Sequence, residues 1–304
     1  MYKNYSLDNK INYTLLKSVC QGDIKSLARL LTVVENNLAF ADDYLKALKI
    51  NDTPVIGITG PPGAGKSTLI NAILTELAKT NKIAVLAVDP TSPFNFGSLL
   101  GDRIRMSSHF NNSNVYIRSI ATRGSLGGLS AKTIEMVDVL KSSNFDYIFI
   151  ETVGVGQSEI EIVGLADISV VVLVPEAGDD IQSIKSGLME IADIFVVNKA
   201  DRDGAKSFAN HLKKLSHHQE KNIAVLETVA HKNIGIDVLL NAINDNKANK
   251  NSKKPYLYAQ KAYKLIQEDR MKNLDKEKLQ QEITEALQSS DFNLYQFIER
   301  FKHS

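Results

Sequence analysis

The sequence predicts an α/β fold with a mostly parallel central sheet, and two observations support this prediction. Short apolar runs rich in Val and Ile recur from residue 54 onward, and helix-like stretches separate several of them. Continuous apolar runs are typical of strands that are buried on both faces of a parallel sheet. Strands that alternate with helices imply crossover connections. Ligands bind such sheets at the carboxyl ends of the strands, so we expect a site in the loops that follow these runs.

Each element follows from one of these two patterns. The expected strands are residues 55–59, 83–88, 115–117, 147–150, 168–174, 194–197 and 223–226. The clearest helices between them are residues 69–79, 132–142, 181–191 and 205–215. We expect this alternation to form one central domain over residues 51–245.

Helical extensions are expected on both sides of the central domain. Residues 1–50 are expected to be helical, with Ile24, Leu27, Leu31 and Val34 spaced for one packing face. The polar, lysine-rich segment 244–255 favours a solvated linker, with a weak basic contact as the alternative. Residues 246–304 are therefore expected to hold this linker and a helical extension. Apolar positions in the extension recur at helical spacing and need a partner surface, either the main domain or a second copy of the chain: Leu279, Ile283, Leu287, Leu294, Ile298 and Phe301.

Composition narrows the class of protein. The 304 residues include 36 basic and 35 acidic side chains, so the formal net charge is +1, and a nucleic-acid partner is not expected. Cys20 is the single cysteine, which excludes an internal disulfide and a cysteine-based metal site within one chain. The apolar runs are far shorter than the roughly 20 residues that span a bilayer, and the first residues lack the apolar stretch of a signal peptide. We therefore expect a reduced, cytoplasmic protein with no membrane partner.

The strongest motif is a phosphate-binding loop between an expected strand and an expected helix. It fits the pattern G-x-x-x-x-G-K-[ST] over residues 60–67, and Thr68 follows directly. The residues expected to bind the nucleotide here are Gly60, Pro61, Pro62, Gly63, Ala64, Gly65, Lys66, Ser67 and Thr68. Glycines let the backbone N–H groups face phosphate oxygens, and the helix N-terminus adds partial positive charge. Lys66 can reach the β- and γ-phosphates, and Ser67 can bind Mg²⁺.

A second motif indicates which base is bound. The tetrad Asn198-Lys199-Ala200-Asp201 follows the expected strand 194–197. The Asp201 carboxylate can accept hydrogen bonds from the guanine N1–H and 2-amino group, and adenine offers neither donor at those positions. Asn198 and Lys199 are expected to brace the loop and the face of the ring. Together with the phosphate loop, the tetrad predicts specificity for guanine.

Acidic residues at two other strand ends suit magnesium and a sensor of the γ-phosphate. Glu151 follows the strand 147–150, and Gly154 comes three residues later, where its N–H can bond the γ-phosphate while it is present. Asp89 follows the strand 83–88 and offers a second acid for Mg²⁺. We expect Ser67, Asp89 and Glu151 to be the metal-binding residues.

Hydrolysis without a partner is expected to be slow. Ras-type enzymes place a glutamine directly after the sensor glycine to orient the attacking water, but here that position is Val155, and Gln157 lies two residues further on. Arg103, Arg105 and Arg123 are candidate stabilisers of the developing charge.

With these residues in view, the chain resembles the MeaB/ArgK-type P-loop GTPases, which are chaperones of adenosylcobalamin-dependent acyl-CoA mutases. The resemblance covers residues 20–240, and its most specific segments are GPPGAGKST at 60–68, VDPTSP at 88–93, GSLLGDRIRM at 97–106, ETVGVGQSE at 151–159, AGDDIQSIKSG at 177–187 and NKAD at 198–201. The combination is more distinctive than any one nucleotide motif. The fold it implies is a P-loop NTPase with helical extensions.

The resemblance also implies a function. It implies a GTPase that uses GTP, GDP and Mg²⁺, docks on methylmalonyl-CoA mutase or a relative, gates cofactor loading and protects that enzyme. Cobalamin would be met only through the partner enzyme, and the C-terminal extension would form a homodimer. An older label for the family, a kinase of amino-acid transport systems, fits no acceptor site in this sequence.

The resemblance also implies roles for individual residues. The resemblance places Asp102 and Arg105 in a first switch, with Lys66, Glu151 and Gly154 completing the catalytic set. It places Asp179, Gln182 and Lys185 in a third switch that couples the nucleotide state to the mutase, and it places Val229 and Ala230 in the last loop that contacts the base.

Some positions depart from the family pattern. Asn95 and Phe96 replace small residues in the first switch, and Glu176 stands where the family often has glycine. Val229 and Asn233 replace a serine and a glycine of the last loop. Since Val229 has no hydroxyl, weaker guanine binding is expected.

Three alternatives remain open. A nickel-type metal-insertion GTPase would need clusters of His or Cys, and His217-His218 is the single adjacent pair. A small-molecule kinase would need an acceptor pocket, for which the sequence offers no sign. An assembly protein with vestigial nucleotide binding would not need intact Lys66, Ser67, Glu151 and Asp201.

Overall fold

The structure is a computed structural model of the whole chain. It describes residues 11–89, 106–121, 131–152, 165–176, 192–217, 223–248, 254–288, 291–299 and 301. The chain divides into two units, Met1–Lys261 and Ala262–Ser304. Within the described residues, no helix is both long and apolar enough to cross a bilayer.

The first unit is built on a seven-stranded sheet in the order β3-β2-β4-β1-β5-β6-β7, and every neighbouring pair is parallel. The α/β fold class is therefore confirmed. The strands are β1 (Val55–Thr59), β2 (Ile83–Asp89), β3 (Val115–Ala121), β4 (Tyr147–Thr152), β5 (Ile168–Leu173), β6 (Ile194–Val197) and β7 (Ala224–Glu227).

Each expected strand is present, and the largest difference is in β3. We expected a strand over 115–117, but β3 continues to Ala121 through Arg118 and Ser119. Most of its residues are only half-buried, since β3 lies at an edge of the sheet. An edge strand tolerates polar side chains, so an apolar pattern alone underestimates its length.

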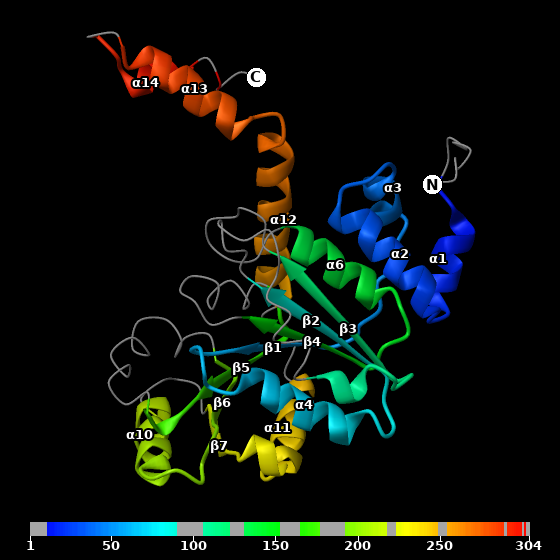
Figure 1. Cartoon of the computed structure of the whole chain (residues 1–304), viewed down its shortest axis with the longest axis vertical. Helices are drawn as coiled ribbons and strands as arrows, with labels where there is room; N and C mark the ends of the chain where they lie inside the picture. Colours follow the sequence, from blue (N-terminus) through cyan, green and yellow to red (C-terminus); the bar gives the residue numbers. More distant parts are fainter. Residues whose placement is uncertain are drawn as a thin grey trace. The chain divides into compact units, whose positions relative to one another are not determined.

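Helices cover both faces of the sheet (Figure 1). Helix α4 (Lys66–Leu77) and α11 (Ile236–Ala248) lie on one side, and α6 (Ala131–Lys141) lies on the other. Helix α10 (Ala205–His217) packs on β6 and β7. In β5 and β6, the buried residues that share a cluster with α10 alternate with those that face α4. Three of the four expected helices are thus confirmed, and the fourth, at 181–191, lies outside the described residues.

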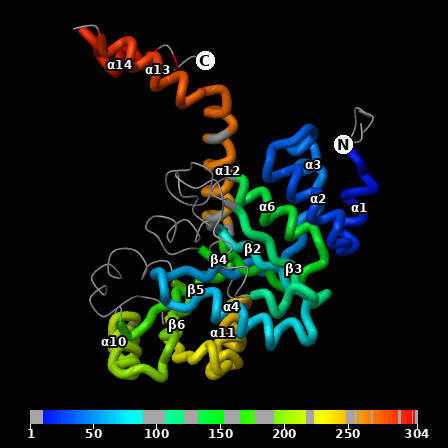
Figure 2. Tube along the Cα trace, viewed as in Figure 1, coloured from blue at the N-terminus to red at the C-terminus, as the bar shows by residue number. Residues whose placement is uncertain are grey.

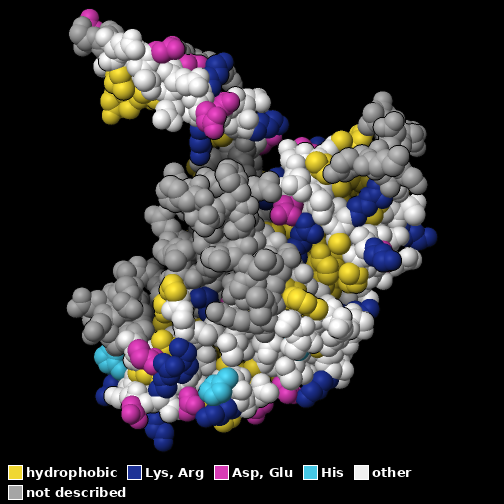
Figure 3. All heavy atoms as spheres, in the orientation of Figure 1, with side chains coloured by type: hydrophobic (Ala, Val, Ile, Leu, Met, Phe, Trp, Pro, Cys, Tyr) yellow, Lys and Arg dark blue, Asp and Glu magenta, His cyan; other side chains and the backbone are white. Residues whose placement is uncertain are grey.

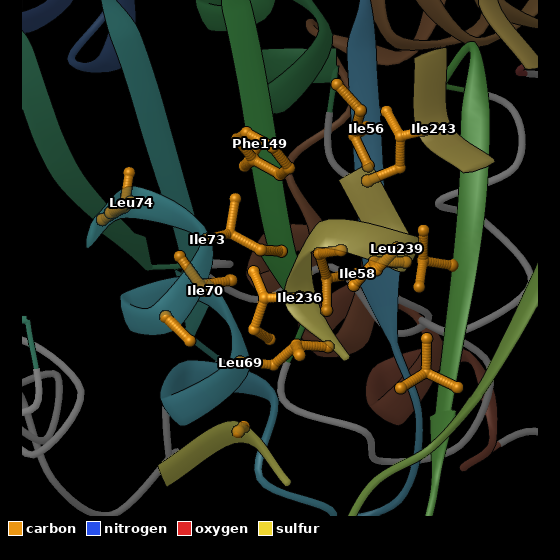
Figure 4. Packing of buried hydrophobic residues seen from close by; sticks show 14 of the residues in the cluster. Ile56, Ile58, Leu69, Ile70, Ile73, Leu74, Phe149, Ile236, Leu239 and Ile243 are labelled. Carbon is orange, nitrogen blue, oxygen red and sulfur yellow. The ribbon is translucent and has the colours of Figure 1, made fainter. Parts of the chain in front are cut away.

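The main core forms where α4 and α11 meet the sheet (Figure 4). Ile56 and Ile58 of β1 point into it, with Ile70 and Ile73 from α4 and Leu239 from α11. All five are fully buried, and burying each such side chain contributes about 1.5–3 kcal/mol. This packing fixes the start of α4 against the end of β1, which is where the phosphate loop lies.

Three helices precede the sheet: α1 (Tyr13–Cys20), α2 (Ile24–Glu35) and α3 (Ala41–Lys46). Figure 2 shows them beside α6, which α2 and α3 contact. The buried face of α2 holds Leu27, Leu31 and Val34 as expected, but the expectation for Ile24 is wrong, because Ile24 is 40% exposed. Ile24 is the first helical residue, and Leu30 completes the face instead.

The lysine-rich segment 244–255 is helical at both of its ends. Helix α11 runs to Ala248. Its last turns contact Tyr147: the Tyr147 hydroxyl donates to Asn244 Oδ1 at 3.0 Å, and Lys247 Nζ lies 3.6 Å from the centre of the Tyr147 ring. Helix α12 (Lys254–Met271) begins before Pro255, a position that proline tolerates because it needs no N–H donor there. Residues 249–253 lie outside the described part of the chain.

The C-terminal helices leave many apolar side chains exposed. They are α12, α13 (Lys276–Ala286) and α14 (Leu294–Glu299). Leu287, Leu294 and Tyr295 are 59%, 50% and 77% exposed, and Figure 3 shows apolar side chains gathered on one side of this segment. No residue of α13 or α14 is buried among those described.

Candidate functional site

The phosphate loop joins β1 to α4 in a conformation that requires glycine at two positions. Gly60 has a φ of 137°, and a Cβ there would lie 2.0 Å from the carbonyl oxygen of Val172 in β5. Gly65 has a φ of 87°, and its Cβ would lie 2.5 Å from Asn198 Nδ2. Side chains are excluded at both positions, first by backbone conformation and then by contact. The loop is therefore packed against β5 and against the base tetrad.

Lys66 is the first residue of α4, and its side chain turns back over the loop. It is only 6% exposed, and its Nζ donates to the carbonyls of Gly60 at 2.8 Å and Pro61 at 3.1 Å. The first N–H groups of a helix lack partners within the helix and attract anions. A cation and a helix N-terminus therefore meet inside the loop, which is the electrostatic environment that a triphosphate requires.

Ser67 and Glu151 meet although they lie far apart in the sequence. The Ser67 hydroxyl donates to Glu151 Oε1 at 2.7 Å, and both side chains are buried. The register of the sheet explains the contact, since Glu151 of β4 pairs with Ile58 of β1, just before the loop. One residue further along, the hydroxyls of Thr59 and Thr152 lie 3.0 Å apart.

Oxygen atoms that can bind a metal therefore collect at this end of the sheet, from Ser67 and Glu151. Asp89 ends β2 beside β4, so its backbone lies at the same edge, but its side chain is outside the described part of the structure. Among the described residues, no cluster of three or more His, Cys, Asp or Glu side chains could hold a metal ion. The site offers hydroxyl and carboxylate oxygens, which are the ligands that Mg²⁺ prefers.

Asn198 connects three loops. Its Nδ2 donates to the Ala64 carbonyl in the phosphate loop at 2.9 Å. Its Oδ1 accepts from the Thr228 hydroxyl at 3.1 Å and from the Ala230 N–H at 3.2 Å. Asn198 is 2% exposed. The sequence predicts a bracing role for this residue, and the hydrogen bonds are those of a brace between the phosphate loop, the base tetrad and the last loop.

Asp201 lies at the exposed edge of the same arrangement. Lys232 Nζ donates to Asp201 Oδ2 at 2.8 Å, and His231 Nε2 lies 3.9 Å from the same oxygen. The hydrogen bond from the Lys232 ammonium lowers the pKa of Asp201 below its usual range. Asp201 is therefore ionised at neutral pH. The ionised form leaves both carboxylate oxygens free of protons, so that each can accept a hydrogen bond from an N–H donor.

The last loop contributes residues that sequence reasoning missed. Thr228 is fully buried, and its hydroxyl donates to Asn198 Oδ1. Val229 is buried and its N–H donates to Ile234 O at 3.0 Å, while the Ala230 N–H is engaged by Asn198. The signal in the sequence for Thr228 was its position as a hydroxyl residue directly before the expected contact pair. Lys232 carried no signal, because its contact with Asp201 is tertiary.

Several predicted residues lie outside the described part of the chain. They are Asp102, Arg103, Arg105, Arg123, Gly154, Asp179, Gln182 and Lys185. Glu176, at the boundary of that part, forms an exposed ion pair with Arg202, which follows Asp201. The hydrogen bond from Arg202 lowers the pKa of Glu176.

A glycine-rich phosphate loop at the end of β1, with a lysine and serine opening α4 and an Asn-Lys-x-Asp loop after β6, defines a P-loop protein of the guanine-nucleotide-binding class. The family model described as "Methylmalonyl Co-A mutase-associated GTPase MeaB" matches residues 27–288. The chain therefore belongs to the MeaB family of GTPases, and both the predicted family and the predicted GTPase class are confirmed.

Individual proteins agree with the family. A Pyrococcus horikoshii protein whose name describes it as a GTPase is 53% identical over 194 residues, which are 63% of this chain and 61% of that protein. The mouse methylmalonic aciduria type A homolog is 46% identical over 151 residues, covering 49% of this chain and 36% of that protein. The chain thus matches less than two thirds of the length of these two relatives.

A solved structure agrees with the fold. The crystal structure of a LAO/AO transport system kinase superposes with a TM-score of 0.69 at 24% identity, covering 97% of this chain and 98% of that one. At this identity the likeness supports the arrangement of strands and helices, and nothing about that protein's substrate is carried over.

Proposed function

We propose that this chain binds and hydrolyses GTP as a chaperone of an adenosylcobalamin-dependent acyl-CoA mutase, gating cofactor loading and protecting that enzyme. The family description, which names association with methylmalonyl-CoA mutase, supports the choice of partner. The observation that carries the proposal is Asn198, whose hydrogen bonds join the phosphate loop to both base-reading loops. Phosphate recognition and base recognition are therefore parts of one site.

The roles of the binding residues follow from their chemistry. The N–H groups at the start of α4 and the Lys66 ammonium face the β- and γ-phosphates, and Lys66 exchanges the carbonyls of Gly60 and Pro61 for phosphate oxygens. Asp201 accepts from the guanine N1–H and 2-amino group, which adenine cannot provide. Lys199 packs along the ring, and the last loop at Val229 and Ala230 closes on the other edge of the base.

Magnesium is the metal that the donor set fits. Ser67 and Glu151 would hold it, directly or through water, with Asp89 as a further acid; when bound it neutralises charge on the triphosphate. Ser67 would bind the metal through its hydroxyl oxygen, the atom whose proton is donated to Glu151 in the described structure. Cobalamin belongs to the proposed partner enzyme.

Slow hydrolysis by the isolated chain is the expected consequence of this constellation. Val155 follows the sensor position Gly154 and cannot orient a water molecule. The group that orients the water is then supplied when the mutase docks. Asp102 and Arg105 of the first switch belong to the catalytic set, and Asp179, Gln182 and Lys185 of the third switch couple the nucleotide state to the mutase.

The test is GTP hydrolysis by the purified chain, alone and with the cobalamin-dependent mutase from the same cell. We expect the rate to rise at least about tenfold with the mutase, which corresponds to a barrier lower by about 1.4 kcal/mol. The Lys185→Ala variant should keep the rate of the isolated chain and lose the stimulation. An unchanged rate with the mutase would contradict the chaperone function and leave the GTPase class intact.

We also propose that the C-terminal extension forms a homodimer. The support for this proposal is the exposure of three apolar side chains. Leu287 directly follows α13, and Leu294 and Tyr295 are the first two residues of α14. Contiguous exposed apolar side chains are typical of an interaction surface. Light scattering should give twice the mass of the 33.6 kDa chain, and Leu294→Glu with Tyr295→Glu should give one chain mass. Gln288→Glu is the matched control, and a monomeric wild-type protein would rule the dimer out.

A further inference from the structure

Asp201, the carboxylate proposed to recognise guanine, is already occupied by a side chain of the protein. Lys232 Nζ lies 2.8 Å from Asp201 Oδ2, within hydrogen-bonding distance, and His231 Nε2 lies 3.9 Å from the same atom. Both side chains come from the last loop, the segment proposed to contact the base. The contact is therefore located inside the base site itself.

Backbone hydrogen bonds hold both partners, so movement of side chains alone is enough to open this contact. Lys232 ends the short helix η5 (Ala230–Lys232), and its N–H donates to Val229 O at 2.9 Å. Val229 is itself bridged to Ile234. On the other side, the Ala200 N–H donates to Thr228 O at 3.0 Å. The distance between the two backbones is thus set by hydrogen bonds that the nucleotide does not touch.

The carboxylate has to serve two kinds of donor. Guanine recognition requires one N–H donor on each carboxylate oxygen, and Oδ2 is the oxygen that Lys232 holds. An ammonium on the carboxylate weakens it as an acceptor and repels the partial positive charge of the guanine N–H groups. The side chains of Lys232 and Asp201 are 51% and 34% exposed, so opening the pair costs little, as is usual for exposed ion pairs.

We propose that Lys232 competes with the guanine base for the Asp201 carboxylate, so that release of Lys232 is a step in guanine-nucleotide binding. This inference rests on the proposed role of Asp201 in reading the base. Lys232 is then a specificity-site residue that lowers the affinity for guanine nucleotides and makes it depend on salt. It acts only on the base, because the phosphate loop lies at the buried end of the site.

The test compares dissociation constants for GDP and ADP in the wild-type chain and in Lys232→Met. Loss of a cation near an anionic nucleotide ordinarily weakens binding. Competition predicts the opposite sign: Lys232→Met should bind GDP about two- to fivefold more tightly, the range expected from an exposed pair, with ADP affinity unchanged. Lys214→Met, an exposed lysine of α10, is the matched control and should not tighten GDP binding.

Two further measurements sharpen the result. Lys232→Arg keeps the charge and offers two parallel N–H donors to the carboxylate, so it should bind GDP no more tightly than the wild type. The gap between Lys232→Met and the wild type should shrink as salt is raised, because exposed charges are screened. Equal or weaker GDP binding by Lys232→Met would overturn the competition.

The two hypotheses fail in different ways. If the wild-type chain prefers GDP over ADP and Lys232→Met gains nothing, the competition is wrong and the base assignment remains. If the wild-type chain binds GDP and ADP equally, the guanine-reading role of Asp201 is wrong, and the competition falls with it.

Discussion

The two ends of the candidate site differ in how far their charged and polar side chains are exposed to solvent. At the phosphate end Lys66, Ser67 and Glu151 are 6%, 3% and 5% exposed. At the base end the side chains of Asp201 and Lys232 are 34% and 51% exposed. Electrostatic contacts are strong where water is excluded and weak where it is present. Substitutions at the buried end should therefore have large effects on binding and stability, whereas those at the exposed end should alter selectivity and leave stability unchanged.

The largest effect on turnover is expected for Lys66→Ala. A charge-assisted hydrogen bond contributes about 1.5–3 kcal/mol, so GTP affinity should fall at least about tenfold, and turnover should be lost. Titration with a fluorescent GTP analogue measures the affinity, and Lys79→Ala, an exposed lysine just beyond α4 that pairs with Glu76, is the matched control. Unchanged turnover in Lys66→Ala would contradict the phosphate-loop assignment.

Asn198→Ala tests the connection between the two ends. It removes the partners of the Ala64 carbonyl, the Thr228 hydroxyl and the Ala230 N–H. Buried polar groups without partners cost about 1–3 kcal/mol, so urea denaturation without nucleotide should show a loss of about 3 kcal/mol. Thr228→Val removes one of these bonds and should cost about 1 kcal/mol. Equal losses in both variants would show that Asn198 does not connect the loops.

Asp201→Asn should change selectivity without changing stability. The amide replaces one carboxylate oxygen with an NH2 donor, which would face one of the two guanine N–H donors. The preference for GTP over ATP should therefore fall by about a hundredfold or more. Competition binding of the two nucleotides gives the ratio, and Asp203→Asn, at an exposed position two residues later, is the control. Retained selectivity would show that another group reads the base.

The smallest effect is expected for Glu176→Gln at the exposed ion pair with Arg202. Surface substitutions change the free energy of unfolding by about 0.5 kcal/mol or less. The lowered pKa of Glu176 gives the sign of the pH dependence: the contribution is present above the ordinary value of 4.5 and is lost as pH falls through the lowered pKa. Urea denaturation from about pH 7 to about pH 5 should therefore show a constant small difference between variant and wild type. A loss comparable to that in Asn198→Ala would contradict the contrast between the two ends.

Much of the fold follows from local patterns. The apolar runs locate all seven strands because parallel strands are buried on both faces, and the errors lie where that condition fails, as in the edge strand β3. Likewise, Ile24 was expected in a buried face, but as the first residue of α2 it projects beyond the packing surface. The spacing of apolar residues identifies which face of a helix is buried. Where that buried face begins and ends depends on the elements that pack against it.

For the site, the sequence determined the chemistry, because a phosphate loop and an Asn-Lys-x-Asp loop are contiguous motifs whose residue types state their function. The tertiary structure decided the contacts between distant segments. Register places Glu151 beside Ser67, packing on Val172 requires glycine at position 60, and the turn after β7 brings Lys232 to Asp201. Contiguous motifs need only local geometry, whereas these pairs depend on how strands far apart in the chain align, which no local pattern records.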